Sequence, residues 1–341
     1  MHSLYPLFRP LLFAADPEHA HALVLAGLDA AARIGLARLA APSLPIAPVD
    51  AMGLRFPNRV GLGAGLDKNA EHLPGLATLG FGFLEAGTVT PRPQPGNPRP
   101  RMFRIVEAQA LVNRLGFNNE GVERFVANVD RAGYRGILGV NIGKNSDTPN
   151  ARAGDDYVAC LRAVHARASY VTINVSSPNT KGLRDLQEEE TLDALLARLV
   201  LERDALALQH GRRVPLVVKI APDLEGDAMR AIARLLIGHR IDGVIATNTT
   251  LARNGVERLP HAGEQGGLSG APLRDRAMAA LRTLAGVLDG ALPIIAAGGI
   301  MSSDEAVERI KAGATLVQLY TGVIYRGPDL VAECVRALAA I

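Results

Sequence analysis

The sequence predicts an α/β protein: a closed (β/α)8 TIM barrel preceded by a two-helix, membrane-associating extension. From about residue 58 onward, short apolar runs alternate with amphipathic segments. The runs are continuously apolar and flanked by helix patterns, which is typical of a parallel sheet covered by helices. Eight such units in roughly 280 residues match the size of a (β/α)8 barrel. Because periodicity does not fix closure, an open doubly wound sheet is the alternative.

The barrel elements are expected between residues 48 and 341. The predicted strands are Val60–Leu62, Phe83–Ala86, Ile137–Asn141, Tyr170–Asn174, Leu216–Lys219, Val244–Thr247, Ile294–Ala297 and Leu316–Leu319. The predicted helices lie near 69–80, 118–131, 155–166, 188–210, 226–238, 272–288, 303–312 and 328–340. Two connections, Pro91–Glu120 and Asn248–Pro272, are unusually long, which favours lids or binding elements.

Residues 1–47 fall outside this repeat and form a separate helical hairpin. A strongly apolar first helix is expected over 4–13, and Asp16 caps a second helix with Pro17 at its first position. The proline-rich stretch 41–48 is the predicted linker. An apolar hairpin whose charges cancel is expected to lie on a membrane by burying area. Packing against the barrel or a partner subunit is the alternative.

Composition excludes several classes of protein. With 48% hydrophobic and 21% charged residues, the chain is globular, and no apolar run is long enough to span a membrane. The start lacks the features of a secretory signal. Two isolated cysteines and the lack of a metal-ligand cluster predict neither disulfides nor a metal site. A net charge of +3 is too small to indicate nucleic-acid binding.

Polar residues follow every predicted strand, and in a barrel these strand ends meet on one face. The segment Asn174–Thr180 is the most informative, because it presents two carboxamides and two adjacent hydroxyls. A polar turn is the simpler explanation of this segment alone. Gly298-Gly299 and Tyr320–Gly322 follow the last two strands, where such barrels hold phosphate, although a tight turn has the same composition.

Two lysines complete the strand-end set. Lys68 is expected either to pair with Asp67 or to bind a substrate carboxylate, and Lys219 ends a buried strand. Since no Ser-His-Asp arrangement is present, the chemistry is expected to come from a cofactor, with the protein supplying position and one proton acceptor.

These strand-end motifs resemble those of a known family along essentially the whole chain. The matching stretches are Gly65–Lys68, Gly87–Pro93, Asn113–Asn118, Asn141–Lys144, Asn174–Asn179, Val218–Asp223, Thr247–Thr250, Gly266–Gly270 and Gly298–Ile300. The chain resembles the dihydroorotate dehydrogenases, specifically the class 2, quinone-reducing branch. The resemblance implies FMN-dependent oxidation of (S)-dihydroorotate to orotate in de novo pyrimidine (UMP) biosynthesis, with a membrane quinone as the electron acceptor.

The resemblance also implies roles for individual residues. Ser177 falls on the catalytic base that removes the C5 proton while hydride leaves C6 for flavin N5, and Lys219 falls beside the flavin ring. The FMN-contacting positions are Ala64, Gly65, Leu66, Asp67, Lys68, Thr88, Asn141, Asn174, Lys219, Thr247, Gly270, Gly299, Tyr320 and Thr321. The dihydroorotate-contacting positions are Lys68, Asn113, Arg114, Leu115, Gly116, Phe117, Asn174, Asn179, Asn248 and Thr249.

In the family, the N-terminal helices form a membrane-lying tunnel for ubiquinone or menaquinone. His21 and Arg104 fall on quinone-contacting positions, although each has an ordinary surface explanation. We therefore expect a monomer bound peripherally to the cytoplasmic side of the cell membrane, with no nucleic-acid partner. Thr180 and a water path past Phe117 are candidate routes for the proton.

Three alternatives carry different expectations. A class 1 member of the family is soluble, uses fumarate or NAD, has Cys at the base position and lacks the helical start; Ser177 and residues 1–40 argue against it. A flavin-dependent RNA-modifying barrel needs a basic surface, for which the five arginines between 92 and 114 are the only candidate. A non-catalytic membrane scaffold leaves the strand-end polar residues unexplained.

Overall fold

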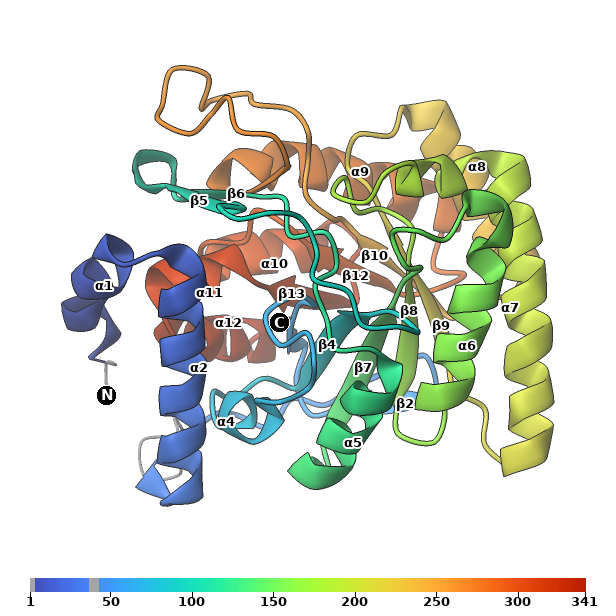
Figure 1. The fold of residues 1–341 in the computed structure, drawn as a ribbon, viewed down its shortest axis with the longest axis horizontal. Helices are drawn as coiled ribbons and strands as arrows, with labels where there is room; N and C mark the ends of the chain where they lie inside the picture. Colours follow the sequence, from blue (N-terminus) through green and yellow to red (C-terminus); the bar gives the residue numbers. More distant parts are fainter. Residues whose placement is uncertain (1–3, 37–42) are drawn as a thin grey trace.

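The computed structural model describes residues 4–36 and 43–341, and it confirms the closed barrel. All eight barrel strands are parallel to their neighbours and close in the order β10-β12-β13-β3-β4-β7-β8-β9 (Figure 1). The open-sheet alternative is therefore wrong. The strands are β3 (Val60–Leu62), β4 (Phe83–Val89), β7 (Ile137–Ile142), β8 (Tyr170–Asn174), β9 (Leu216–Ile220), β10 (Gly243–Ala246), β12 (Ile294–Ala297) and β13 (Leu316–Leu319).

Helices surround the barrel, and each predicted one is present. They are α4 (Leu73–Ala77), α5 (Val122–Ala132), α6 (Ala153–Val164), α7 (Glu189–His210), α8 (Gly226–Gly238), α9 (Arg274–Leu288), α10 (Ser303–Lys311) and α12 (Asp329–Ala339). A short helix, α11 (Thr321–Arg326), was not predicted. The described residues also contain the 3-10 turns η1 (Val106–Ala108), η2 (Asn150–Arg152), η3 (Leu183–Gln187) and η4 (Ala271–Leu273).

The prediction of a helix over 69–80 is wrong at both ends, since α4 has only five residues. The Asp67 carboxylate accepts hydrogen bonds from the backbone N–H groups of Glu71 (2.9 Å) and His72 (2.8 Å). Ala70 has a left-handed φ of 57°. These contacts fold residues 67–72 into a turn before the helix begins.

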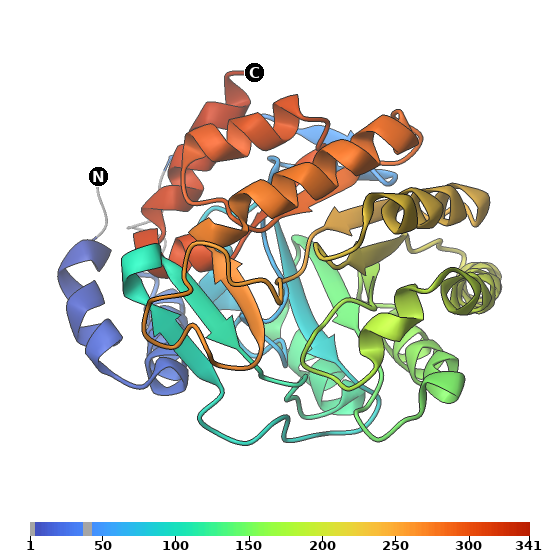
Figure 2. The same cartoon turned by 90° about the horizontal axis from the view of Figure 1, so that it is seen from above.

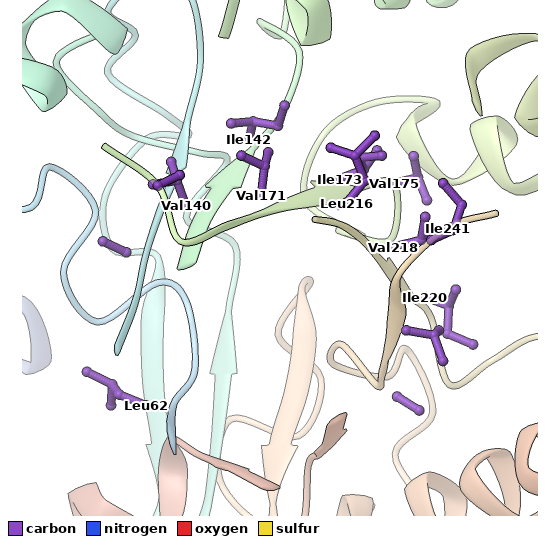
Figure 3. Close-up of a cluster of buried hydrophobic side chains, with 14 of the residues drawn as sticks. Leu62, Val140, Ile142, Val171, Ile173, Val175, Leu216, Val218, Ile220 and Ile241 are labelled. Atoms are coloured by element: carbon purple, nitrogen blue, oxygen red, sulfur yellow. The ribbon is translucent and has the colours of Figure 1, made fainter. Parts of the chain in front are cut away.

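Alternation along each strand decides what the barrel encloses. Side chains such as Val171, Ile173 and Val218 point outward and pack beneath the helices (Figure 3). Inward-pointing Phe83 and Tyr170 fill the amino end of the barrel together with other apolar side chains. Removing one such ring typically costs about 3–5 kcal/mol.

A hairpin of β1 (Val49–Ala51) and β2 (Leu54–Phe56) covers that end of the barrel. Its Phe56 ring meets Phe83 edge-on, with centroids 5.1 Å apart. The sequence did not predict this hairpin. Because the amino end is filled by rings, space for a ligand is left at the carboxyl ends of the strands.

The two long connections form one antiparallel sheet instead of separate lids. It contains β5 (Met102–Ile105), β6 (Ala110–Asn113) and β11 (Gly267–Gly270), in the order β11-β6-β5. Viewed from above, this sheet lies over the barrel mouth between the N-terminal helices and α9 (Figure 2). It brings residues before Arg114 next to residues after Asn248.

The N-terminal helices are α1 (Tyr5–Ala14) and α2 (Pro17–Arg33), with Asp16 capping α2 as predicted. They pack against the barrel: His72 Nδ1 lies 2.7 Å from the Asp29 carboxylate, and Arg9 donates to the Tyr325 carbonyl (3.0 Å). Their outer face is nevertheless apolar and exposed, with Leu7 73% accessible. Part of the predicted linker, 41–42, lies outside the described residues, and 43–48 has neither helix nor strand.

Candidate active site

A cavity opens at the carboxyl ends of the barrel strands, where the sequence predicted the site. Residues at or after every barrel strand except β7 line it, together with residues of the β5-β6-β11 sheet. The predicted residues that line it are Ala64, Gly65, Lys68, Thr88, Asn113, Leu115, Gly116, Phe117, Asn174, Ser177, Asn179, Lys219, Thr247, Asn248, Thr249, Gly270, Gly299, Tyr320 and Thr321.

Four of the residues predicted to contact FMN or dihydroorotate do not line this cavity. Leu66 lines a neighbouring cavity, and the Asp67 carboxylate is occupied by the backbone groups that precede α4. The Arg114 guanidinium forms an ion pair with Glu264 (2.6 Å). Asn141 lies among the buried residues below the cavity. Asp67 forms no close ion pair with Lys68 among the described residues, although its charge raises the pKa of that lysine, and Lys68 lines the cavity.

The floor of the cavity is a network of buried amides and hydroxyls. Thr88 Oγ1 donates to Asn141 Oδ1 (2.5 Å), and Asn174 Nδ2 donates to both oxygens (3.0 Å each). The network fixes which way each carboxamide faces, since the donors and acceptors satisfy one another. Asn174 and Lys219 are direct neighbours in the β8–β9 register, so both reach the same floor.

Glu85 lies beneath this floor and was not predicted as a site residue. Its carboxylate is 1% exposed and accepts hydrogen bonds from Asn141 (2.8 Å), Tyr170 (2.9 Å) and Gln318 (2.7 Å). The sequence does carry a signal for it, because Glu85 is a charged residue inside an apolar strand. Charged residues are rarely fully buried unless they are paired. Burial lowers the pKa of Lys219, and the Glu85 carboxylate opposes that shift.

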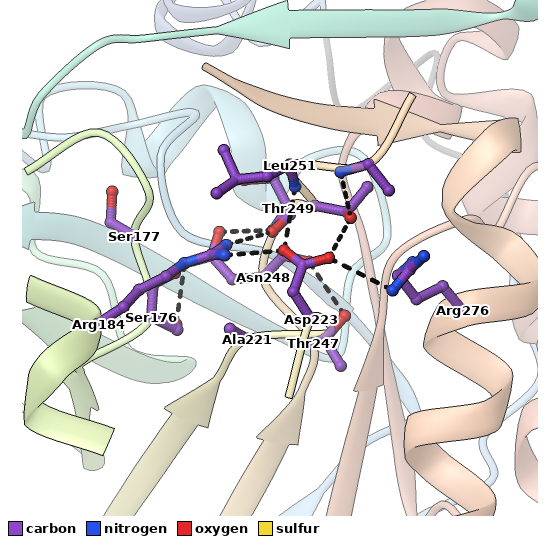
Figure 4. Close-up of polar contacts among 12 residues, drawn as sticks. Ser176, Ser177, Arg184, Ala221, Asp223, Thr247, Asn248, Thr249, Leu251 and Arg276 are labelled. Carbon is purple, nitrogen blue, oxygen red and sulfur yellow. Dashed lines mark hydrogen bonds and ion pairs between the residues drawn. The ribbon is translucent and has the colours of Figure 1, made fainter. Parts of the chain in front are cut away.

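The loop after β8 carries Ser177, which lines the cavity. Figure 4 shows it next to Ser176 on this loop. Asn174 Oδ1 accepts hydrogen bonds from the Ser176 backbone N–H (3.3 Å) and hydroxyl (3.2 Å), which turns the chain at the strand end. Ser177 Oγ accepts from the Asn179 backbone N–H (3.3 Å). A backbone amide donating to this oxygen is suited to stabilise negative charge on it.

Glycines shape the side of the cavity after β11 and β12. At Gly270 (φ +97°) a Cβ atom would lie 2.2 Å from the Gln109 carbonyl oxygen, and at Gly299 (φ +69°) 2.3 Å from Arg274 Cα. Only glycine fits these positions. Thr321 and Ser269 hydroxyls, joined by a 2.9 Å hydrogen bond, line the same cavity. Glycine backbone and hydroxyls in a concave wall suit a phosphate group.

Three buried polar atoms that face the cavity have no hydrogen-bond partner among residues 4–36 and 43–341. They are Asn179 Oδ1, Thr249 Oγ1 and Gln318 Oε1. Because buried polar groups in native proteins are almost always satisfied, these atoms indicate a polar ligand. Thr180 Oγ1 is also buried and unpartnered among the described residues, three positions after Ser177.

Lys68 faces the cavity in an electrostatically tuned environment. Burial lowers its pKa to about 8, the Glu18 carboxylate raises it, and the Arg101 guanidinium lowers it. Arg101 is itself bound by Glu18 through Nε (2.9 Å) and Nη2 (3.0 Å). A carboxylate of the N-terminal hairpin, Glu18, therefore influences the pKa of Lys68 in the cavity. The sequence did not predict this interaction.

A second cavity, of about 350 Å³, lies between the N-terminal hairpin and the barrel. Its wall is mostly apolar, and Tyr320 lines both this cavity and the active-site cavity. His21 and Arg104, the predicted quinone contacts, both line it. Burial lowers the pKa of His21 to about 4, with Lys68 and His72 adding to the shift. At neutral pH the cavity therefore contains an uncharged imidazole.

Arg104 is held at this second cavity by backbone carbonyls. Its Nη1 donates to the carbonyls of Phe13 (3.1 Å) and Ala15 (2.8 Å), and its guanidinium lies 4.9 Å from the Phe13 ring centroid. These contacts fix the turn between α1 and α2 against β5. The single arginine thus both shapes the hairpin and reaches the cavity wall.

The arginines between 92 and 114 do not form an open basic patch. Each guanidinium is engaged: Arg92 with Asp147 (2.7 Å), Arg99 with Glu18 (3.2 Å), Arg101 with Glu18 (2.9 Å), Arg104 with carbonyls, and Arg114 with Glu264 (2.6 Å). Four of the five guanidiniums pair with three carboxylates, since Arg99 and Arg101 share Glu18, so few of these charges are left to attract phosphates. This observation counts against the RNA-modifying alternative.

Metal and thiol chemistry gain no support from the described residues. No group of three or more His, Cys, Asp or Glu side chains is arranged to hold a metal ion there. Both cysteines are buried, and burial raises the pKa of Cys334 to about 12. None of the helices among the described residues is long and apolar enough to cross a bilayer.

Comparison with known proteins places this geometry in a family. A sequence profile described as Dihydroorotate dehydrogenase matches residues 46–341. The chain belongs to the dihydroorotate dehydrogenase family. It is 61% identical over 336 residues to the dihydroorotate dehydrogenase (quinone) of Thiobacillus denitrificans, covering 98% of this chain and 99% of the relative.

Other relatives give the same result. The Burkholderia thailandensis dihydroorotate dehydrogenase (quinone) is 60% identical over 337 residues, covering 99% of this chain and 98% of the relative. The crystal structure of Eimeria tenella DHODH with ferulenol has a TM-score of 0.84 at 38% identity, covering 95% and 90% of the two chains. The resemblance to the quinone-dependent, class 2 dihydroorotate dehydrogenases is thereby confirmed, and the chain is an oxidoreductase of that branch.

Proposed function

We propose that this protein oxidises (S)-dihydroorotate to orotate with FMN as its prosthetic group and passes the electrons to a membrane quinone, in de novo pyrimidine biosynthesis. One observation carries the proposal. A polar cavity that contains Ser177 and several carboxamides adjoins an apolar cavity at the shared residue Tyr320. A small anionic substrate and a lipophilic acceptor require two such neighbouring environments.

The polar cavity fits the flavin and the substrate. FMN, when bound, accepts the hydride from C6 of dihydroorotate. The Gly270 and Gly299 wall, with Thr321, would hold its phosphate, and Lys219 would lie near the ring, where a cation stabilises negative charge. FMN contacts at Leu66, Asp67 and Asn141 have no support from the cavity wall.

The substrate is proposed to lie against the loops that carry Asn113, Asn179 and Asn248. Carboxamides match the donors and acceptors of an amide-rich pyrimidine, and Lys68 supplies a cation for its carboxylate. The unpartnered Asn179 Oδ1 and Thr249 Oγ1 gain partners in this arrangement. A contact from the Arg114 side chain is disfavoured by its ion pair with Glu264.

Ser177 is proposed to remove the C5 proton, so that a C5–C6 double bond forms as the hydride leaves C6. A serine hydroxyl is a weak base, so its own proton must leave the site as the C5 proton arrives. The Thr180 hydroxyl is buried and has no partner among the described residues, which supports Thr180 as the first group to receive the proton that leaves Ser177. The ring of Phe117 also borders the cavity.

The second cavity is proposed to bind the head of ubiquinone or menaquinone, with His21 and Arg104 beside it. The exposed apolar face of α1 supports peripheral attachment to the cytoplasmic side of the cell membrane, where the cavity meets the lipid. A monomer suffices, since a single chain contributes both cavities.

A visible spectrum of the purified protein tests the proposal. A flavin absorbance that bleaches on anaerobic addition of dihydroorotate and returns on addition of a quinone is the expected result. Colourless protein, or a flavin reduced by NADH and not by dihydroorotate, would contradict it. Reoxidation by fumarate in place of quinone would favour the class 1 alternative.

A further inference from the structure

We infer that Arg184 and Asp223 form a clamp that positions the Ser177 loop for proton removal, a role that rests on the proposed function. Neither residue lines the active-site cavity. Both lie behind the loops that do, where they join the connections after β8, β9 and β10 (Figure 4). The clamp makes Arg184 a positioning residue.

Arg184 contacts all three loops with one guanidinium. Its Nε donates to the Ser176 carbonyl (3.1 Å), Nη1 to the Asp223 carboxylate (2.8 Å) and Nη2 to the Thr249 carbonyl (2.9 Å). Three donors in a fixed plane specify the relative placement of three acceptors. A flexible cation with one nitrogen cannot reproduce that arrangement.

The bond to Ser176 determines how the next residue is presented. The Ser176 carbonyl belongs to the same rigid peptide plane as the Ser177 backbone nitrogen. Fixing this carbonyl from behind therefore fixes the position of the Ser177 Cα atom, from which the side chain extends toward the cavity. The part of the chain that the structure describes gives this hydroxyl one hydrogen bond, from the Asn179 N–H, so its position depends on the loop backbone.

Asp223 fixes the loop on the substrate side. Its carboxylate accepts hydrogen bonds from the Thr250 hydroxyl and from the Leu251 backbone N–H (3.0 Å). This loop carries Asn248 and Thr249, which line the cavity. The Arg184–Asp223 pair thus sets the distance between the base and the residues expected to hold the substrate.

A further contact ties the clamp to β9. Gln187, in the same 3-10 turn as Arg184, accepts a hydrogen bond from the Ala221 N–H (2.9 Å) and donates weakly to the Arg184 carbonyl (3.4 Å). The arginine side chain is only 20% exposed and that of Asp223 equally so. A partly buried ion pair with this many directional bonds is better defined than an open surface pair.

The test is anaerobic stopped-flow measurement of both half-reactions in the FMN-bound enzyme. Arg184→Lys should lower the rate constant of flavin reduction at saturating dihydroorotate by about 10- to 100-fold, since misplacement near 1 Å costs about that much. Reoxidation of the reduced flavin by decylubiquinone should stay within about twofold of wild type, because the second cavity is lined by other residues.

Asp223→Asn is the second variant. It should slow flavin reduction and also weaken orotate binding several-fold, since it releases the loop that carries Asn248 and Thr249. Arg276→Gln is the matched control: Arg276 also approaches the Asp223 carboxylate (3.7 Å) from α9, and the described hydrogen bonds give it no contact with the Ser177 loop. Its reduction rate should remain within about twofold of wild type.

The outcomes separate the two proposals. Wild-type flavin that dihydroorotate does not reduce overturns the proposed function together with the clamp. Wild-type bleaching with normal reduction in Arg184→Lys overturns the clamp alone. Equal slowing of both half-reactions, or loss of FMN from both Arg184→Lys and Asp223→Asn, would assign the pair to general stability and overturn the positioning role.

Discussion

At the scale of single residues, the site is organised by strand alternation. Inward positions two apart along β8 and β9 take the chain from Tyr170 and Val217 in the apolar layer to Asn174 and Lys219 at the cavity. The same rule places Gln318 at the cavity wall and Glu85, which accepts its hydrogen bond, beneath the cavity. A polar residue inside an apolar strand was the readable signal for both, and the strand-end search did not use it.

Ser177→Ala should abolish turnover at neutral pH while FMN stays bound. A positioned acid or base typically contributes about 10²- to 10⁴-fold to the rate. Among the described residues Ser177 Oγ is hydrogen-bonded to a backbone N–H and to no side chain that could act as the base in its place. Rapid-mixing measurement of flavin reduction checks this. Reoxidation of the dithionite-reduced variant by quinone should be normal, and near-normal reduction by dihydroorotate would remove Ser177 from the mechanism.

Lys68 should make ligand affinity depend on pH. Its pKa in the unliganded protein is about 8, and a bound carboxylate raises it, so binding takes up a proton above pH 8. Orotate affinity should therefore be level below pH 8 and fall above it, by at most tenfold per pH unit. Flavin absorbance titrations from pH 6 to 10 measure this. The Lys68→Met variant should bind orotate weakly, and its affinity should not fall above pH 8. If the fall in affinity is unchanged in this variant, a group other than Lys68 causes it.

At the scale of elements, the sequence predicted the strands and helices whose apolar residues recur with a clear period. All eight barrel strands and the helices between them were confirmed, because continuous apolar runs and amphipathic helices are local signals. The β1–β2 hairpin and the β5-β6-β11 sheet were missed. Their strands are only three or four residues long, and β11 pairs with β6 from more than 150 positions away. Pairing of that kind has no local signature.

The candidate site was also predictable only in part: its residues could be predicted from their places at strand ends, but their contacts could not. Strand-end polar residues could be assembled once a barrel was assumed, which recovered Ser177, Lys219 and most of the cavity wall. Side-chain direction could not be predicted: the Asp67 carboxylate accepts from backbone N–H groups and Arg114 pairs with Glu264, so their predicted ligand contacts remain predictions without support from these side chains. The Arg184–Asp223 clamp depends on three loops meeting, which only the tertiary structure reveals.

The hairpin α1–α2 supplies the apolar cavity, so filling that cavity should separate the two half-reactions. Val24→Trp adds bulk to the wall that α2 contributes. Quinone-dependent reoxidation should slow at least tenfold through a higher apparent KM, while dihydroorotate reduces the flavin at the normal rate. Stopped-flow traces with decylubiquinone check this. Leu23→Trp, on the exposed face of the same helix, is the control. Equal effects of both variants would contradict a quinone site here.

At the scale of the whole molecule, the two cavities are arranged between two environments. The polar cavity lies at the barrel mouth, and the apolar cavity lies beside it, lined by residues of the hairpin. Figure 1 shows α1 and α2 packed along one side of the barrel. The outer face of α1 exposes Leu7 and Leu11, and Leu4 at the N-cap is exposed on the same side by the spacing of three and four. Such a face is suited to a bilayer surface, and it would turn the apolar cavity toward the lipid that contains the quinone.

Leu7→Asp combined with Leu11→Asp should therefore detach the protein from membranes without harming its polar site. Both side chains are more than 70% exposed, so their replacement leaves the packed core intact. Cosedimentation with neutral phosphatidylcholine vesicles should fall at least tenfold, because the attraction is apolar and not electrostatic. Turnover with vesicle-embedded quinone should fall with it, while reduction by dihydroorotate stays normal. Undiminished vesicle binding by this variant would show that another surface holds the membrane.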